Sequence, residues 1–236
     1  MTDKAELKFA GFTPATSDFL WGLAFNNERE WFLAHKDEFE RVLNTPFKAL
    51  AADTFTLMHQ RFPKRDIQLH IARIYRDARR LHGRGPYKDH LWFSIKGDDR
   101  LLEGPMFWFE VGAADYSYGM GFYSATPAQM ELFRRSVDAN PARFERLAKK
   151  VEALPGFRVT GDEYKRPKGH HSEIIDRWYN RKLLGVECTR DFGDELFSPA
   201  LSETLVNAYA ALMPMYDYWI DACYKGSDDN KKQDLL

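Results

Sequence analysis

Residues that could do chemistry are concentrated between Arg76 and His90 of this 236-residue chain. In this stretch a carboxylate, a phenol and an imidazole stand among several arginines and a lysine. Glycines and a proline within 83–86 indicate a turn, and an apolar run begins at Leu91. Polar groups this dense beside a core strand must either satisfy one another or bind a ligand.

The cationic residues of this stretch are suited to binding an anion. Arg76 and Arg79 can each hold a carboxylate or a phosphate through two parallel hydrogen bonds, because the guanidinium is a planar fork of donors. Lys88 would add a point charge, and Tyr87 and His90 would donate hydrogen bonds. The stretch therefore predicts a site for a small anionic ligand that carries phosphate or carboxylate.

Four further residues complete the predicted site. Trp92 or Trp108 would wall the pocket, and Asp77 or Glu110 would orient an arginine. The same pattern fits a second interpretation, in which arginines and carboxylates pair with each other and hold a long loop in place. The two interpretations are compatible, and the sequence leaves both open.

Two other classes of function fit the same residues. The first is an enzyme of unknown class with His90 or Glu110 as its general base. The second is an interaction module for single-stranded nucleic acid or protein, in which Trp92, Trp108 and Tyr118 would stack on bases. The formal net charge of -1, from 34 basic and 35 acidic residues, argues against nucleic acid as the partner.

A second basic segment, at 165–171, contains two lysines, an arginine and two histidines. It can close over an anionic ligand as a lid, or it can be a solvated surface loop, which is the simpler interpretation. No metal site and no cofactor are predicted. The seven histidines include no HExxH pattern, and the two cysteines, Cys188 and Cys223, form no CxxC pair.

The bulk properties are typical of a cytoplasmic protein. Hydrophobic residues make up 44% of the chain and charged residues 29%, which is ordinary for a globular domain. The first residues lack the apolar region of a signal peptide, and no apolar run approaches the ~18 residues of a membrane helix. We therefore expect a cytoplasmic location without membrane contact, and the oligomeric state is left open.

Helix starts are marked by a capping residue that is followed by proline, because proline tolerates the first helical position. The pattern occurs at Thr13-Pro14, Thr45-Pro46, Thr126-Pro127, Asn140-Pro141 and Ser198-Pro199. Asn27 is predicted to cap a further helix, with Glu30 completing a capping box. Helices therefore occupy the N-terminal 60 or so residues and most of the chain after residue 126.

Strands are indicated where apolar residues alternate with others at a period of two. This happens at 91–95, 107–111 and 116–122, with polar turns between them, and predicts an antiparallel meander. Shorter strands are predicted at 67–75, 157–160 and 182–189. Gly119 and Gly121 precede no helix, so they indicate close approach of neighbouring strands and not a phosphate-binding loop.

The order of elements predicts an α+β fold. An antiparallel sheet of about four to six strands would be flanked by N-terminal and C-terminal helices. We expect a single globular domain over residues 1–225, followed by a disordered polar tail over 226–236.

The chain also carries a set of short motifs that together resemble one family. They include Phe9-Ala10-Gly11-Phe12, Asn26-Asn27-Glu28, Arg76-Asp77-x-Arg79, Pro86-Tyr87-Lys88 and Gly104-Pro105 ahead of Phe107-Trp108-Phe109-Glu110. The sequence resembles bacterial and fungal conserved hypothetical proteins catalogued as domain of unknown function 2461 (DUF2461). After the second arginine the family usually has Phe-Ser-Lys-Asp-Lys, whereas this chain has Arg80-Leu81-His82-Gly83-Arg84. The resemblance implies no established activity.

Overall fold

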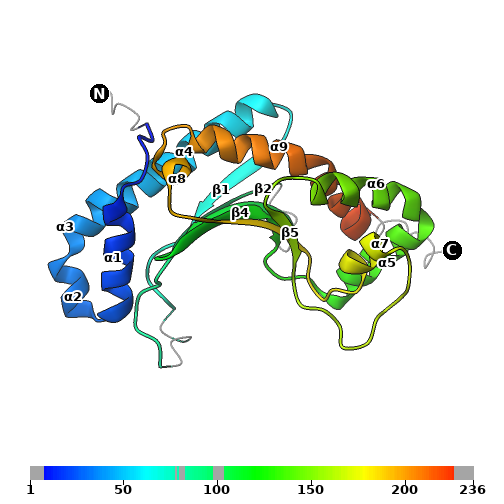
Figure 1. The fold of residues 1–236 in the computed structure, drawn as a ribbon, viewed down its shortest axis with the longest axis horizontal. Helices are drawn as coiled ribbons and strands as arrows, with labels where there is room; N and C mark the ends of the chain where they lie inside the picture. The colour runs from blue at the N-terminus through cyan, green and yellow to red at the C-terminus, as the bar shows by residue number, and fades with distance from the viewer. Residues whose placement is uncertain (1–7, 78, 80–82, 98–103, 226–236) are drawn as a thin grey trace. The chain divides into compact units, whose positions relative to one another are not determined.

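A computed structural model describes residues 8–77, 79, 83–97 and 104–225 (Figure 1). Three features of the sequence fall outside these residues. They are the polar tail 226–236, the turn signal at 98–99 and the departure from the family pattern at 80–82. The Thr-Pro, Asn-Pro and Ser-Pro motifs and the strand residues all lie within the described part.

The fold is α+β, as the order of elements predicts. A six-stranded antiparallel sheet has the strand order β1-β2-β3-β4-β6-β5. The strands are β1 Ile67–Ile71, β2 Leu91–Gly97, β3 Pro105–Val111, β4 Asp115–Phe122, β5 Phe157–Thr160 and β6 Gly185–Asp191. The predicted meander is therefore confirmed as β2, β3 and β4. The predicted strand at 67–75 ends at Ile71, and Tyr75 forms only an isolated bridge to Tyr87.

The chain divides into two compact units. Unit 1 comprises 1–95, 108–118 and 189–207, and unit 2 comprises 96–107, 119–188 and 208–236. The helices assigned wholly to unit 1 are α1 Pro14–Phe25, α2 Arg29–Ala34, α3 Lys36–Phe39, the π-helical turn Glu40–Asn44, α4 Thr45–Arg61 and α8 Asp194–Phe197. Those of unit 2 are α5 Pro127–Ala139, α6 Pro141–Glu152, α7 Glu173–Tyr179 and the π-helical turn Asp221–Lys225.

The longest helix, α9, runs from Leu201 to Ile220 and contributes residues to both units. Pro214 lies inside it, where it removes one backbone donor. Neither α9 nor any other helix of the described chain is both long and apolar enough to cross a membrane.

Capping residues begin several of these helices. The Thr126 hydroxyl accepts a hydrogen bond from the backbone N–H of Gln129 at 3.2 Å. The side-chain oxygen of Asn140 accepts one from the backbone N–H of Arg143 at 3.0 Å. The predicted cap at Thr45 is wrong, because the preceding residue already has helical backbone angles and the π-helical turn continues into α4. The predicted cap at Asn27 is also wrong, since Glu28 precedes α2 and its side chain caps nothing.

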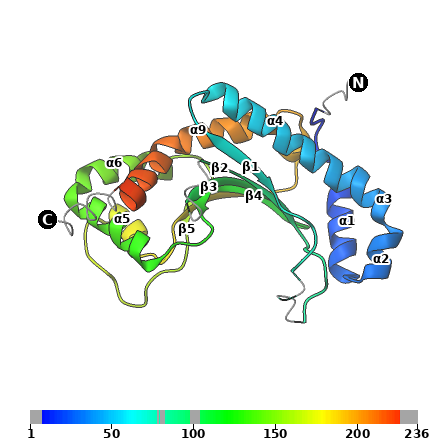
Figure 2. The same cartoon turned by 180° about the vertical axis from the view of Figure 1, so that it is seen from behind.

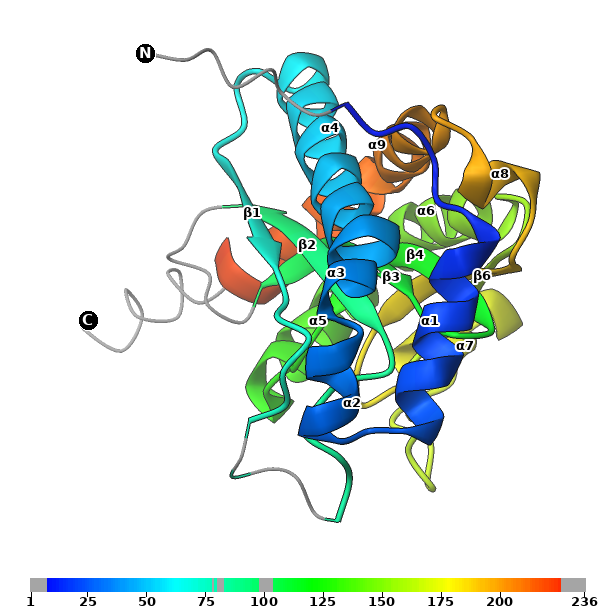
Figure 3. The same ribbon diagram turned by 90° about the vertical axis from the view of Figure 1, so that its left-hand side faces the viewer.

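The core of unit 1 lies between α4 and one face of β2 and β3. The Phe47 ring of α4 lies 5.7 Å from the ring of Phe93 and 6.1 Å from that of Phe109, centroid to centroid. Phe93 and Phe109 are 5.6 Å apart and both are completely buried. The helix also lies against β1, as Figure 3 shows. The strand face that carries Phe93 and Phe109 therefore lies in the core, as the alternation of apolar residues predicts.

The core of unit 2 is aromatic. The Tyr216 ring stacks on Phe107 at 4.9 Å, and Trp219 lies 5.5 Å from Phe122. Trp178 of α7 contacts Trp219 at 6.2 Å between centroids. Figure 2 shows α5 and α6 beside the C-terminal part of α9. The high aromatic content of the sequence is thus used largely as buried ring contacts.

Two glycines let β4 and β6 approach each other, as predicted for Gly119 and Gly121. A Cβ atom on Gly119 would lie 2.0 Å from the carbonyl oxygen of Val186, and one on Gly121 would lie 2.9 Å from Cα of Gly185. Both obstacles are backbone atoms, which cannot rotate away. The sheet therefore excludes side chains at these two positions.

Replacing Gly119 by alanine should break this contact. We expect Gly119→Ala to lower the free energy of unfolding by about 2 kcal/mol or more, the size typical of overpacking. The matched control is Gly193→Ala, where the backbone is extended and nothing lies within 4 Å of the added Cβ. Urea denaturation of both variants checks the prediction, and equal stabilities would contradict it.

Candidate functional site

The candidate site lies in unit 1, where the connection from β1 to β2 folds back on itself. The Arg76 amide donates to the carbonyl of Pro86 at 2.8 Å, and the Lys88 amide donates to that of Ile74 at 2.7 Å. Tyr75 and Tyr87 form an antiparallel bridge between these two bonds. A short ladder therefore sets the side chains that precede β2.

Tyr87 anchors this ladder to the helices. Its ring is 3% exposed and stacks on Phe32 of α2 at 4.1 Å. The Asn27 side chain holds the backbone of Tyr87 on both sides: its amide nitrogen donates to the Tyr87 carbonyl at 3.0 Å, and its oxygen accepts from the Tyr87 amide at 2.9 Å. Gly85 makes room for Asn27, because a Cβ atom there would lie 2.3 Å from Asn27 Cγ.

Arg76 acts mainly as an internal clamp. Its Nε atom donates to the Tyr87 carbonyl at 2.7 Å, and its Nη2 atom lies 3.3 Å from Asp89 Oδ1. Its side chain is 16% exposed, whereas that of Asp89 is 52% exposed. The interpretation of the arginines as a network that holds a long loop therefore describes Arg76 well.

Arg79 lies in a more exposed part of the connection. Its guanidinium is bound by both carboxylate oxygens of Asp77, the shorter contact being 2.8 Å, and its backbone amide donates to the same carboxylate at 3.0 Å. Asp77 therefore fixes the orientation of the Arg79 guanidinium. The pair is local, however, because only two positions separate its members.

His90 lies between two carboxylates. Its Nδ1 atom is 3.0 Å from Asp89 Oδ1, and its Nε2 atom is 3.9 Å from Glu110 Oε2. Burial raises the pKa of Asp89, but the hydrogen bond from His90, a backbone hydrogen bond and the charges of His90 and Arg76 together outweigh burial, so this pKa ends below its usual value. The distance from His90 to Asp89 is short enough for a hydrogen bond, whereas the distance from His90 to Glu110 is too long for one.

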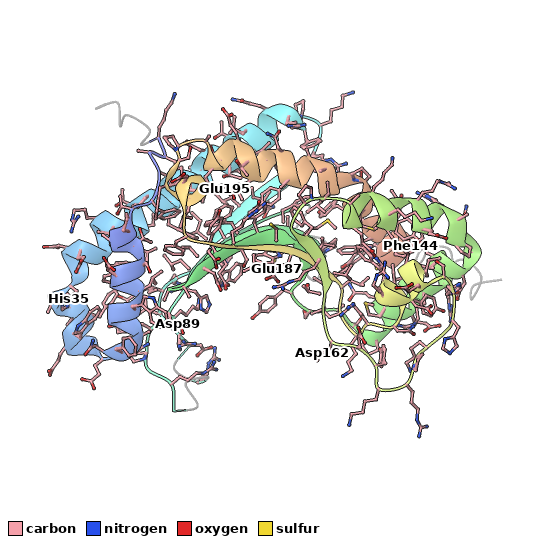
Figure 4. All side chains as sticks on the ribbon, viewed as in Figure 1. His35, Asp89, Phe144, Asp162, Glu187 and Glu195 are labelled. Carbon is pink, nitrogen blue, oxygen red and sulfur yellow. The ribbon has the colours of Figure 1, made fainter. Side chains whose placement is uncertain are left out.

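Lys88 is half-buried, and its Nζ atom donates to the carbonyl of Arg73 at 2.7 Å. Burial and the charge of Arg76 lower the pKa of Lys88, with a smaller effect from Arg73, and Glu110 opposes them. We refer to these neighbouring side chains as the Lys88 cluster; its members are Arg73, Arg76, Lys88, Asp89, His90 and Glu110. Figure 4 marks Asp89 of this cluster.

The two tryptophans lie on the same side of the sheet as His90 and Glu110, because side chains two positions apart on a strand share a face. Trp92 and Trp108 are both half-buried, and the Trp92 ring lies 5.5 Å from that of His70. Tyr118, in contrast, is 3% exposed. The idea that Tyr118 stacks on bases is therefore wrong, because its ring belongs to the core.

The structure brings together most of the predicted site. Arg76, Tyr87, Lys88 and His90 are linked by the contacts above. Arg79 and Asp77 form their own exposed pair, and Asn27 was missed as a member. No local pattern could have revealed Asn27, because its partner is 60 positions away. Within the described residues, no group of three or more His, Cys, Asp or Glu side chains could hold a metal ion.

Fold and site together define an α+β protein with an antiparallel sheet and a mixed-charge cluster beside its second strand. The family model of conserved hypothetical proteins DUF2461 matches residues 15–218, and the chain belongs to this family. A search of curated proteins finds no match. The resemblance seen in the sequence motifs is thus confirmed.

The clamp on Tyr87 can be tested with adjacent asparagines. Asn27→Ala removes both hydrogen bonds to the Tyr87 backbone, so we expect a loss of about 1–3 kcal/mol in the free energy of unfolding. Asn26→Ala is the matched control, because Asn26 is exposed and its side chain donates to the carbonyl of Gly22 in the helix that it ends. Chemical denaturation measures both, and a loss for Asn26→Ala as large as that for Asn27→Ala would contradict the assignment.

Proposed function

We propose that this protein binds a small anionic ligand at the Lys88 cluster. The observation that carries the proposal is that the half-buried Lys88, which donates to the backbone carbonyl of Arg73, lies under the electrostatic influence of Arg73 and Arg76 beside the start of β2. Two carboxylates, Asp89 and Glu110, accompany them, so the cations are in excess. An anion placed against Lys88 would relieve the repulsion among these like charges.

The internal contacts leave Lys88 as the main ligand-binding cation. An ammonium has three N–H donors, and within the described residues its hydrogen bond to the Arg73 carbonyl takes one of them. Arg76 has already committed Nε and Nη2 to the chain. Arg76 therefore supplies charge and holds the backbone, while Lys88 can contact a carboxylate or phosphate oxygen directly.

The neighbouring groups favour a ligand with an additional polar and planar or apolar part. His90 is 30% exposed and can donate or accept a hydrogen bond next to Lys88. Trp92 and Trp108 offer half-buried rings on the same face. Such rings suit a flat or apolar group better than a fully hydrated ion. This combination of a cation, a hydrogen-bonding imidazole and aromatic rings favours an organic molecule with a phosphate or carboxylate group as the ligand.

A thermal-shift screen of anionic metabolites should find the ligand. A ligand at 100 times its Kd stabilises the protein by about 2.7 kcal/mol. We expect Lys88→Met to weaken binding of the hit at least about tenfold, or ~1.4 kcal/mol, whereas the exposed control Lys64→Met should leave it unchanged. Binding to Lys88→Met with unaltered affinity, or a silent panel, would count against the proposal.

Proton uptake provides a second readout of the same contact. Because the pKa of Lys88 is lowered in the free protein, a bound anion should raise it and draw in a proton. Calorimetry between about pH 9 and 10, close to the usual lysine pKa, in two buffers of different ionisation enthalpy should therefore reveal uptake. Lys88→Met should abolish it, and proton release on binding would have the wrong sign.

A second candidate function is acid–base catalysis by His90. The Asp89 carboxylate lies 3.0 Å from Nδ1, where it accepts the hydrogen of that nitrogen and so orients the imidazole, while Nε2 is beyond hydrogen-bonding distance of Glu110. A carboxylate behind one imidazole nitrogen is the arrangement that holds a histidine base in place.

Turnover of the ligand would decide this second function. If the ligand is converted, we expect His90→Gln to lower kcat by about 10²–10⁴-fold and to change Kd little, because glutamine keeps a polar group but cannot exchange protons. A kcat unaffected by His90→Gln would assign the residue to binding alone. Rapid-quench measurements of product formation separate kcat from binding.

A further inference from the structure

Unit 2 contains a buried arginine that is only partly satisfied. Arg134 of α5 is 6% exposed, and its Nε and Nη2 atoms both reach Glu131 Oε2, at 3.3 and 3.2 Å. Its Nη1 atom is buried and has no hydrogen-bond partner among the described residues. Buried polar atoms are rarely left unpaired, so each such atom requires an explanation.

A loop brings a second cation and an aromatic ring to Arg134. The Arg134 guanidinium carbon lies 5.7 Å from the ring centroid of Tyr164, and the ammonium of Lys168 lies 4.7 Å from the same centroid. Both distances are within the range of cation–π attraction. The ring of Tyr164 is thus in contact with two positively charged side chains.

The backbone of this loop is anchored and not free to swing. The Asn180 side-chain oxygen accepts from the amides of Lys168 at 2.7 Å and Gly169 at 3.4 Å, and its carbonyl accepts from the Tyr164 amide at 2.9 Å. Figure 4 marks Asp162 at the start of the loop, where its carbonyl accepts from the Lys182 amide. Side-chain rotation of Tyr164 is therefore the simplest way to uncover Arg134.

The nearby carboxylate that could have neutralised Arg134 is engaged elsewhere. Asp138 lies one helical turn further along α5, and its two oxygens contact Tyr179 Oη and His171 Nε2, both at 3.0 Å. Burial, followed by this hydrogen bond, raises the pKa of Tyr179 to about 12. Asp138 therefore holds α7 and the loop, and Glu131, itself 52% exposed, is the carboxylate on Arg134.

We propose that Arg134 is the base of a second anion site, in which Nη1 binds one oxygen of a carboxylate or phosphate group. Lys168 supplies the second charge, and the Tyr164 ring moves aside to admit the ligand. A guanidinium has five donors in a fixed fork, and Glu131 occupies only the edge formed by Nε and Nη2. The opposite edge matches an oxyanion in shape and in charge.

The experiment titrates the full-length protein with inorganic phosphate and, separately, with acetate, by calorimetry. It is done in the Lys88→Met background, so that heat from the Lys88 cluster does not overlap. We expect saturable binding of at least one anion, a loss of at least about tenfold in affinity for Arg134→Gln, and a several-fold loss for Lys168→Ala. The matched control is Arg135→Gln, an exposed neighbour that also faces Glu131.

Each outcome supports or overturns the proposal. Preference for phosphate or for acetate identifies the class of oxyanion. Saturable binding that survives both Arg134→Gln and Lys168→Ala would overturn the site, as would no saturable binding of either anion, which would make Arg134 a structural residue. If Arg134→Gln fails to fold, Lys168→Ala decides, because Lys168 is exposed. This site shares no residue with the Lys88 cluster, so either proposal can fail alone.

Discussion

A β-strand can bury only one of its two faces against a given layer of helix, and this constraint organises unit 1. Once Phe93 and Phe109 are committed to the core beneath Phe47, the residues at alternating positions along the same two strands must project from the other side. His90 and Glu110 are brought together in this way, although twenty positions separate them. The polar groups of the candidate site are thus placed by the burial of their apolar neighbours.

The residues of the site divide into those that hold the chain and those that can meet a ligand. Asn27 and Arg76 both bind the Tyr87 backbone, and the Tyr87 ring stacks on Phe32. Asn27 and Arg76 direct hydrogen-bond donors to the chain, Asn27 through its amide nitrogen and Arg76 through Nε and Nη2. Lys88 and His90 lie close after this anchor in the sequence and keep hydrogen-bonding capacity. The proposed anion site depends on this division, because a backbone held in place keeps ligand-binding side chains in position.

Arg134, in contrast to Arg76, is a buried cation whose hydrogen-bond donors are incompletely satisfied by the described residues. Burial has removed its guanidinium from water, yet the described part of the chain supplies one carboxylate where several acceptors are needed. The incomplete satisfaction of a buried cation is unfavourable unless something else completes it. Tyr164 offers only the face of a ring, which attracts the charge but accepts no full hydrogen bond.

The sequence by itself determined what depends on near neighbours along the chain. Capping at Thr126 and Asn140 and alternation in β2, β3 and β4 are local, because helix ends and strand faces are decided within a few residues. The close approach of the backbones at Gly119 and Gly121 of β4 could also be predicted from the sequence, since glycine in an apolar strand often marks a place where another backbone comes near. The α+β class followed from the order of these elements.

Only the tertiary structure decided which polar groups became partners. Asn27 looked like a helix cap, but the fold uses it to hold Tyr87, sixty positions away. Arg76 could have faced a ligand or a carboxylate, and its place beside the Tyr87 carbonyl committed its Nε donor to the chain. Hydrogen bonds between distant residues depend on how strands and helices are brought together, and residue types and spacing alone carry no record of that arrangement.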